Sequence, residues 1–325
     1  SGITRKAKLT GPSEVSSPMG KHYVAEVDGG TSGVNVGDVA TWELPPAEID
    51  AEGLVHTHAC DDLSALAAAV CAMDELLKRR LRGESMEPTR LFFTRAEEIG
   101  FIGAIAACKL GTMPPDARVV ALENSRSFAD SPIGAGPIVR VGDRLSIFDP
   151  RLTDACAQRA EHLAGAPATP RASQKAGDVR PSMPWQRKLM AGGACEASVY
   201  CAYGYSATCL CLPLGNYHNM SDLASVQDGT YDRAALGPPR VGREFIGLQD
   251  YFGLIDLLVA IGQSLPLPGK GSAKVARFES LLASKQDVLG RPILGAAPAR
   301  RASRARGVKA ASRGRGGKKR ARRGA

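Results

Sequence analysis

Glu97 and Glu98 are adjacent in the stretch FFTRAEEIGFIG, directly after an apolar run. Adjacent carboxylates repel each other, and an exposed loop has no need of both. A metallohydrolase, by contrast, uses one carboxylate to hold a metal ion and a nearby one to take a proton from water. The pair therefore predicts a metal site in which the two glutamates have different roles.

Other oxygen and nitrogen donors occur where predicted strands end or a predicted helix begins: Asp61, Asp62, Glu123 and His218. Taken singly, each has an ordinary explanation, as an aspartate that caps a helix, a solvated carboxylate or a surface histidine. Taken together, hard oxygen donors and one imidazole fit a zinc-type site. Catalytic residues of α/β folds gather at the carboxyl ends of strands, so we expect these side chains to meet there.

The elements that must position these residues alternate along the chain. Apolar spacing predicts helices over 61–81, 100–110, 150–163, 194–203 and 244–261. Strands are expected at 90–94, at 117–124, twice within 137–149, and at 206–214, and residues 164–184 should form a loop. Short β-rich pieces with glycine turns precede them at 19–44. This alternation predicts a three-layer α/β/α sandwich with a mainly parallel mixed sheet that is buried on both faces.

Charge is distributed unevenly. The chain of 325 residues has a net charge of +9, and residues 295–325 hold twelve Lys and Arg and no acids. Subtracting these twelve charges leaves about −3 for residues 1–294. The basic segment has a single valine and no other large apolar side chain, so it cannot build a core and is expected to be a disordered tail. Such tails bind phosphates without sequence choice, so non-specific contact with nucleic acid or an acidic surface is one accessory role for it, and a solubilising extension is the alternative.

The compartment is expected to be reducing and cytoplasmic. None of the eight cysteines shows CxxC spacing, and Cys209 and Cys211 lie two apart on one face of a predicted strand. We interpret them as buried free thiols. The sequence lacks a run of eighteen apolar residues, so no membrane span is expected. The chain begins with Ser1 and shows no signal peptide, which suggests a processed product or a fragment.

Five segments resemble a known family in order along the chain: HACDDLSALAAAVCAMDEL, FFTRAEEIGFIGA, VVALEN, GGACEASVYCAYGYSATCLCLPLGNYHNM and EFIGLQDYFGLIDLL. They are similar to the co-catalytic zinc aminopeptidases, and within that zinc exopeptidase clan to the glutamyl, or tetrahedral, aminopeptidases. The resemblance extends over roughly residues 20–265. Its most specific parts are the paired glutamates followed by Ile99 and Gly100, and the block from Gly192 to His218.

The resemblance implies a role for each candidate. Asp61 is similar to the carboxylate that bridges two zinc ions, Glu97 to the general base, and Glu98 to a ligand of one zinc. Glu123 stands where the family more often has an aspartate, so a metal could shift by the length of one methylene. His218 resembles the imidazole that completes the site. Zn²⁺ is the expected cofactor, as one or two ions, with Co²⁺ or Mn²⁺ as alternatives.

The chain departs from the family pattern at one ligand. The family's first ligand is a histidine in a His-x-Asp segment before an inserted β domain, and residues before Asp61 lack that pattern. Either an upstream segment is missing or only one metal binds well. His56 and His58 could substitute, although residues that flank the entry to the site are the simpler interpretation.

The resemblance also implies a domain plan. Residues 1–50 would be the end of an accessory β domain, 51–265 the metallopeptidase domain, 266–294 a helical extension and 295–325 the basic tail. We expect a metal-dependent aminopeptidase that hydrolyses N-terminal peptide bonds, with peptides as substrates and self-assembly into a homo-oligomer. The alternative is a peptidase-like binding or assembly protein that lacks the first zinc ligand and uses its basic tail on nucleic acid or acidic surfaces.

Overall fold

The protein is described by a computed structural model that covers residues 4–17, 20–168, 183–267, 269, 273–285 and 288. Its largest sheet contains β5 (Arg118–Arg126), β8 (Ser206–Leu214), β6 (Ile138–Asp143) and β7 (Gln186–Met190), in that spatial order. Neighbouring strands are parallel in the β5–β8 and β6–β7 pairs and antiparallel in β8–β6. The predicted mixed α/β fold with a mainly parallel sheet is therefore confirmed.

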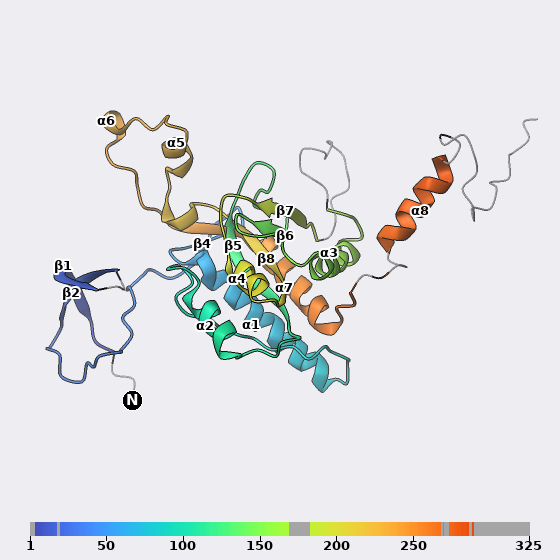
Figure 1. The fold of residues 1–325 in the computed structure, drawn as a ribbon. Coiled ribbons are helices and arrows are strands. Elements are labelled where there is room, and N and C mark those ends of the chain that lie inside the picture. The colour runs from blue at the N-terminus through green and yellow to red at the C-terminus, as the bar shows by residue number, and fades with distance from the viewer. Residues whose placement is uncertain are drawn as a thin grey trace, which may run out of the picture.

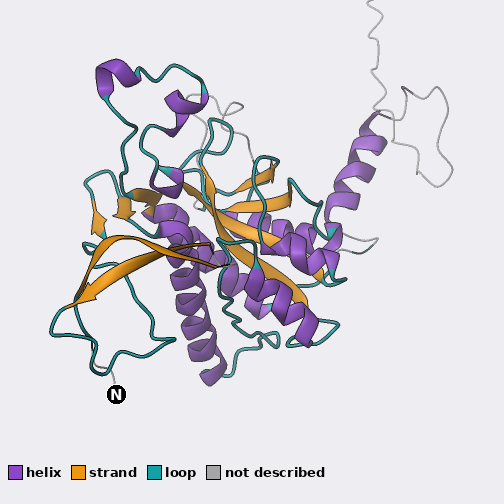
Figure 2. Ribbon diagram, turned by 60° about the vertical axis from the view of Figure 1, so that its left-hand side comes forward, coloured by secondary structure: helices purple, strands orange, loops and turns teal. Residues whose placement is uncertain are grey.

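Helices cover this sheet on both faces, as Figures 1 and 2 show. On one face pack α1 (Cys60–Leu81), α3 (Pro150–Ala164) and α7 (Leu248–Gln263), and on the other α2 (Ile102–Leu110) and α4 (Glu196–Ala202). Side chains of β8 alternate between the two layers, because successive residues of a strand point to opposite faces. Leu210 and Leu212 enter the core with α1, α3 and α7, whereas Cys209 and Cys211 join Ala197 of α4.

All eight cysteines are free in the structure. Cys209 and Cys211 are buried on the same face of β8, as their spacing predicts, whereas Cys71 is exposed. A strand that buries both faces needs an almost uninterrupted apolar sequence, which explains the run ATCLCLPL.

The structure also contains two smaller sheets. β3 (Glu48–Ile49), β4 (Leu54–Thr57) and β9 (Glu244–Gly247) form an antiparallel sheet, and β1 (Ala7–Ser17) pairs with β2 (Gly20–Val27) in a hairpin. In Figure 1 this hairpin stands apart from the central sheet, as do α8 (Ala273–Lys285) and the segment with α5 (Leu223–Gln227) and α6 (Arg233–Leu236). The proposed domain boundaries remain a prediction.

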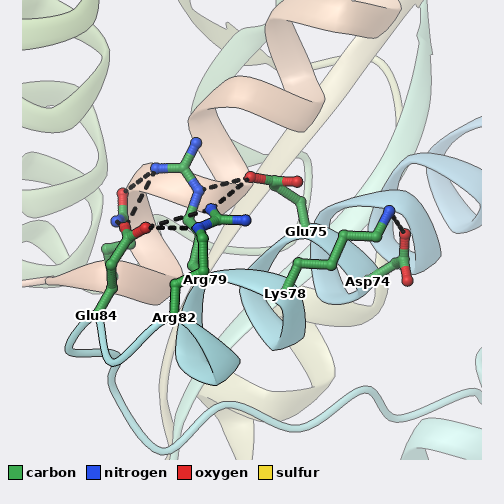
Figure 3. A network of polar contacts seen from close by, with 7 residues as sticks. Asp74, Glu75, Lys78, Arg79, Arg82 and Glu84 are labelled. Atoms are coloured by element: carbon green, nitrogen blue, oxygen red, sulfur yellow. Dashed lines mark hydrogen bonds and ion pairs between the residues drawn. The ribbon is translucent and has the colours of Figure 1, made fainter.

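Helix α1 packs on α7, and polar side chains near its C-terminal end form ion pairs and hydrogen bonds. Its buried face consists mostly of alanines and Leu76, and Gly262 of α7 leaves room for Leu76, because a Cβ there would lie 2.4 Å from Leu76 Cδ1. At the C-terminal end, Arg79 binds Glu75 at 2.8 Å and Gln263 of α7 at 3.2 Å, within the network drawn in Figure 3. Each exposed pair of this kind contributes only a few tenths of a kcal/mol, so burial of the apolar face carries most of the packing energy.

Four expectations about elements are wrong, the first being the second half of the predicted β-rich segment, since residues 28–44 contain no strand. Residues 90–94 form no strand. An apolar run becomes a strand only where it can pair with a neighbouring strand, and among the described residues β5, at the edge of the central sheet, pairs only with β8. Leu91, Phe92 and Phe93 are consequently exposed. Residues 144–149 make only an isolated bridge between Ile147 and Gly142. The predicted helix over 244–261 begins at Leu248, because the first four residues pair with β4 instead.

No helix among the described residues is long and apolar enough to cross a membrane. Residues 169–182, most of the predicted loop, and the whole basic tail at 295–325 lie outside the described residues.

Candidate metal centre

Five residues predicted from sequence line a single pocket of roughly 150 Å³. They are Asp61, Glu97, Glu98, Glu123 and His218, and they come from four different elements. Asp61 opens α1, the two glutamates lie in the turn before α2, Glu123 belongs to β5, and His218 lies in the 3-10 turn η2 (Tyr217–Asn219) after β8. Because β5 and β8 are parallel, Glu123 on β5 and the turn with His218 after β8 lie toward the same end of the sheet, as expected for an α/β fold.

Three of these residues form a tight group. Asp61, Glu98 and His218 each offer one ligand atom, and these atoms all lie within 4.8 Å of one another. His218 Nε2 is 3.7 Å from Asp61 Oδ2. The Asp61 side chain is only 7% exposed, whereas that of His218 is 46% exposed, so the group opens to solvent on the histidine side. Three protein ligands of oxygen and nitrogen type, with one side open to solvent, match the general arrangement of a catalytic zinc site.

The pocket brings several carboxyl groups close together in a partly buried place. Burial, with the nearby Glu98 and Glu244, raises the pKa of Asp61 to about 8. Burial and the adjacent Glu98 raise the pKa of Glu97 to about 7. Burial also holds the pKa of Glu123 well above its usual range, with Cys195 and Asp61 adding to the shift. A divalent cation would neutralise this repulsion and reverse the shifts, so the residues present fit a metal ion.

Glu97 and Glu98 are held in a tight turn and not at the end of a strand, which corrects the geometry expected from sequence. The carbonyl of Glu97 accepts hydrogen bonds from the N–H groups of Gly100 (3.0 Å) and Phe101 (2.8 Å). Ala96 and Phe101 adopt left-handed backbone conformations with φ of 59° and 61°. Gly103 is required next to this turn, because a Cβ there would lie 2.4 Å from the Arg95 carbonyl oxygen. Both glutamates still line the pocket.

His218 sits in an equally constrained turn. Asn216, His218 and Asn219 all have positive φ, between 49° and 60°. Such conformations cost about 1–3 kcal/mol each for non-glycine residues and persist only where surrounding contacts impose them. The Asn219 side chain donates to the backbone oxygens of His58 and Gly242, both at 3.2 Å. The Tyr217 ring stacks on His218 with centroids 3.9 Å apart.

His56 and His58 do not join the centre. His56 Nε2 lies 2.7 Å from Asp50 Oδ2, and neither residue lines the pocket. His58 contributes its backbone oxygen to Asn219 and is absent from the residues that line the pocket. Among the described residues, neither histidine belongs to the group formed by Asp61, Glu98 and His218. The simpler interpretation, that they flank the entry to the site, fits this arrangement.

Several residues of the site escaped the sequence analysis. Phe101, Ala194 and Tyr217 line the pocket, and only Tyr217 could have been inferred, from its position next to His218. Glu244 is 2% exposed and accepts a hydrogen bond from the backbone N–H of Asp61 at 3.0 Å. Its charge at the start of an apolar segment was a signal, but the segment was assigned to a helix and not to a strand.

The fold and the pocket together define a mixed α/β protein with a candidate metal centre at the carboxyl end of its sheet. Comparison with protein families agrees with this class. Residues 25–167 match the sequence model of the M42 glutamyl aminopeptidase family. The resemblance to the co-catalytic zinc aminopeptidases is therefore confirmed over this part of the chain, which includes Asp61, Glu97, Glu98 and Glu123.

Three of the solved structures that the chain matches are aminopeptidases of archaea. The TET aminopeptidase of a marine sediment Thaumarchaeota archaeon is 18% identical with a TM-score of 0.48, and the alignment covers 68% of this chain and 52% of that one. Aminopeptidase APDkam598 of Desulfurococcus kamchatkensis is 17% identical with a TM-score of 0.48, covering 72% and 55%. The TET1 peptidase of Pyrococcus horikoshii is 19% identical with a TM-score of 0.46, covering 68% and 53%.

The aligned part thus spans about half the length of these solved structures. No curated protein matches the chain in a sequence comparison.

Proposed function

We propose that the protein is a metal-dependent aminopeptidase that hydrolyses the N-terminal peptide bond of peptides. The observation that carries the proposal is the group of Asp61, Glu98 and His218, whose ligand atoms lie within 4.8 Å of one another and share a pocket with Glu97. The match of residues 25–167 to a peptidase family supports the same activity.

In this proposal the three grouped residues hold Zn²⁺, with Co²⁺ or Mn²⁺ able to replace it. When bound, the ion supplies Lewis acidity, which activates water and polarises the carbonyl of the scissile bond. Glu97 accepts a proton from the attacking water and returns it to the amine that leaves. Its place in the same pocket as the ligand group, but outside that group, suits a base and not a ligand.

We further infer one tightly bound ion and a weaker second position. Glu123 lines the pocket but does not belong to the ligand group within the described chain. Asp61 is the only residue of that group whose side chain is nearly buried, at 7% exposed, and it could bridge toward Glu123. A second ion would need a further donor. In the family pattern that donor is the histidine of the His-x-Asp segment, which the residues before Asp61 lack.

Partners follow from the same proposal. Peptides are the substrates, and self-assembly into a homo-oligomer is proposed because the Pyrococcus horikoshii TET1 peptidase is described as forming a tetrahedron or a large octahedral shell. Contact of the basic tail with nucleic acid and a cytoplasmic location remain predictions.

The test is metal analysis of the purified protein together with hydrolysis of a panel of aminoacyl p-nitroanilides. We expect activity that is abolished by a chelator and restored by Zn²⁺ or Co²⁺. A folded protein that binds neither ion would refute the proposal. A protein that binds metal and peptides but hydrolyses none of the panel would favour the alternative, a peptidase-like binding or assembly protein.

A further inference from the structure

Strand β9 runs between the two segments that carry Asp61 and His218. On one side it pairs with β4, where Glu244 lies opposite Thr57, four residues before Asp61. On the other side Phe245 exchanges backbone hydrogen bonds with Gly215, three residues before His218, at 2.9 and 3.3 Å. The start of β9 is therefore the point at which these two loops come together.

The side chain of Glu244, the first residue of β9, is buried between these two loops. It is 2% exposed, and its Oε2 accepts the backbone N–H of Asp61 at 3.0 Å. The backbone N–H groups of Asn219 and His218 also face the carboxylate and counteract the rise in its pKa that burial causes. Glu244 neither lines the pocket nor belongs to the ligand group.

Packing alone does not account for a carboxylate at this place. A buried carboxylate is costly, whereas an apolar or amide side chain of the same size would fill the space without that cost. What the carboxylate adds is acceptor oxygens that face the backbone N–H groups of Asp61, His218 and Asn219, in a charge-assisted interaction. The left-handed conformations of His218 and Asn219 need such imposed contacts to persist.

We propose that Glu244 is a positioning residue that holds the backbone of the Asp61 and His218 loops, so that their ligand atoms are placed for the metal before it binds. This inference rests on the proposed metal-dependent function. Outer-shell partners of metal ligands typically contribute about 10–100-fold to metal affinity. Replacing the carboxylate by an amide puts an NH₂ group against backbone N–H groups and should cost an effect of that size.

The experiment compares Glu244→Gln with Asp250→Asn as a matched control. Asp250 is also fully buried, and its carboxylate accepts two backbone N–H groups, from Gly134 and Gly136, both at 2.7 Å. It lies outside the pocket lining. Zn²⁺ affinity is measured by competition with a chelator, and the visible spectrum is recorded with Co²⁺ in place of zinc.

We expect Glu244→Gln to bind Zn²⁺ about 10–100-fold more weakly with a changed Co²⁺ spectrum. The control should lose stability but keep the wild-type affinity and spectrum. Wild-type affinity and spectrum in Glu244→Gln would overturn the inference, and so would equal metal loss in both variants. If Glu244→Gln does not fold, Glu244→Asp keeps the charge and shortens the reach, and the same outcomes apply.

A readout without metal separates this inference from the proposed function. Amide hydrogen exchange of the metal-free protein is followed in segments 58–62 and 216–220. Faster exchange there in Glu244→Gln than in the wild type supports the positioning role even if the wild type binds no zinc, which would refute only the function. Unchanged exchange in both segments overturns the positioning role.

Discussion

Glu97→Gln and Glu98→Gln are the substitutions that separate base from ligand. The two residues are neighbours with the same chemistry, and both line the pocket, but only Glu98 contributes an oxygen to the group with Asp61 and His218. A glutamine at position 97 keeps size and polarity but cannot accept the proton of water. Loss of a general base typically lowers the rate about 10²–10⁴-fold. At 1.36 kcal/mol per tenfold, the barrier should rise by about 2.7–5.4 kcal/mol.

The two variants should differ in bound metal. Glu97→Gln should keep the wild-type zinc content, because position 97 supplies no atom to the ligand group. Glu98→Gln replaces one of three grouped donors by a neutral amide, and it should lower zinc affinity by more than the about 10–100-fold typical of outer-shell changes. Glu97→Gln should not lose stability, since burial and repulsion from neighbouring carboxylates raise the pKa of Glu97 and already disfavour its charge.

The assay measures kcat, KM and bound zinc on both variants, with Glu52→Gln as a control at an exposed position in the turn before β4. Glu97→Gln should lower kcat with little change in KM. Equal metal loss in the two variants would mean that the roles are divided wrongly. Undiminished activity in Glu97→Gln would remove the general-base mechanism altogether.

Three further predictions follow from the sequence and the packing. His218→Ala removes the single imidazole of the ligand group, so zinc content measured by atomic spectroscopy should fall, and full occupancy would refute the assignment. Removal of residues 295–325 should leave melting temperature and peptidase activity nearly unchanged but abolish salt-sensitive binding to nucleic acid, and unfolding would show that the tail belongs to the core. Gly262→Ala places a Cβ 2.4 Å from Leu76 Cδ1 between α7 and α1 and should cost about 1–3 kcal/mol in denaturant unfolding, whereas Gly192→Ala meets no atom within 4 Å and should be neutral.

The sequence by itself identified the five acidic and imidazole side chains that line the candidate pocket, and most of the elements that carry them. Glu97, Glu98 and His218 were evident because donors of the right kind directly follow or precede apolar runs, and residue order alone places them beside strands and helices. Strand β8 was predicted with its observed bounds, because a strand buried on both faces requires an apolar run that no exposed segment would keep.

Only the tertiary structure decided the elements that depend on a partner. Residues 90–94 have a strand-like sequence but no neighbour to pair with, whereas Glu244–Gly247 pair with β4 although they precede a long helix. The structure also shows that Asp61, Glu98 and His218 form the tight group while Glu123 stays outside it. Glu244 could not be recognised as a contact of Asp61 from sequence, because 183 positions separate them and their hydrogen bond exists only where β9 lies between the two loops. Local propensity acts along the chain, but pairing and the positions of ligand atoms are set by contacts between distant segments.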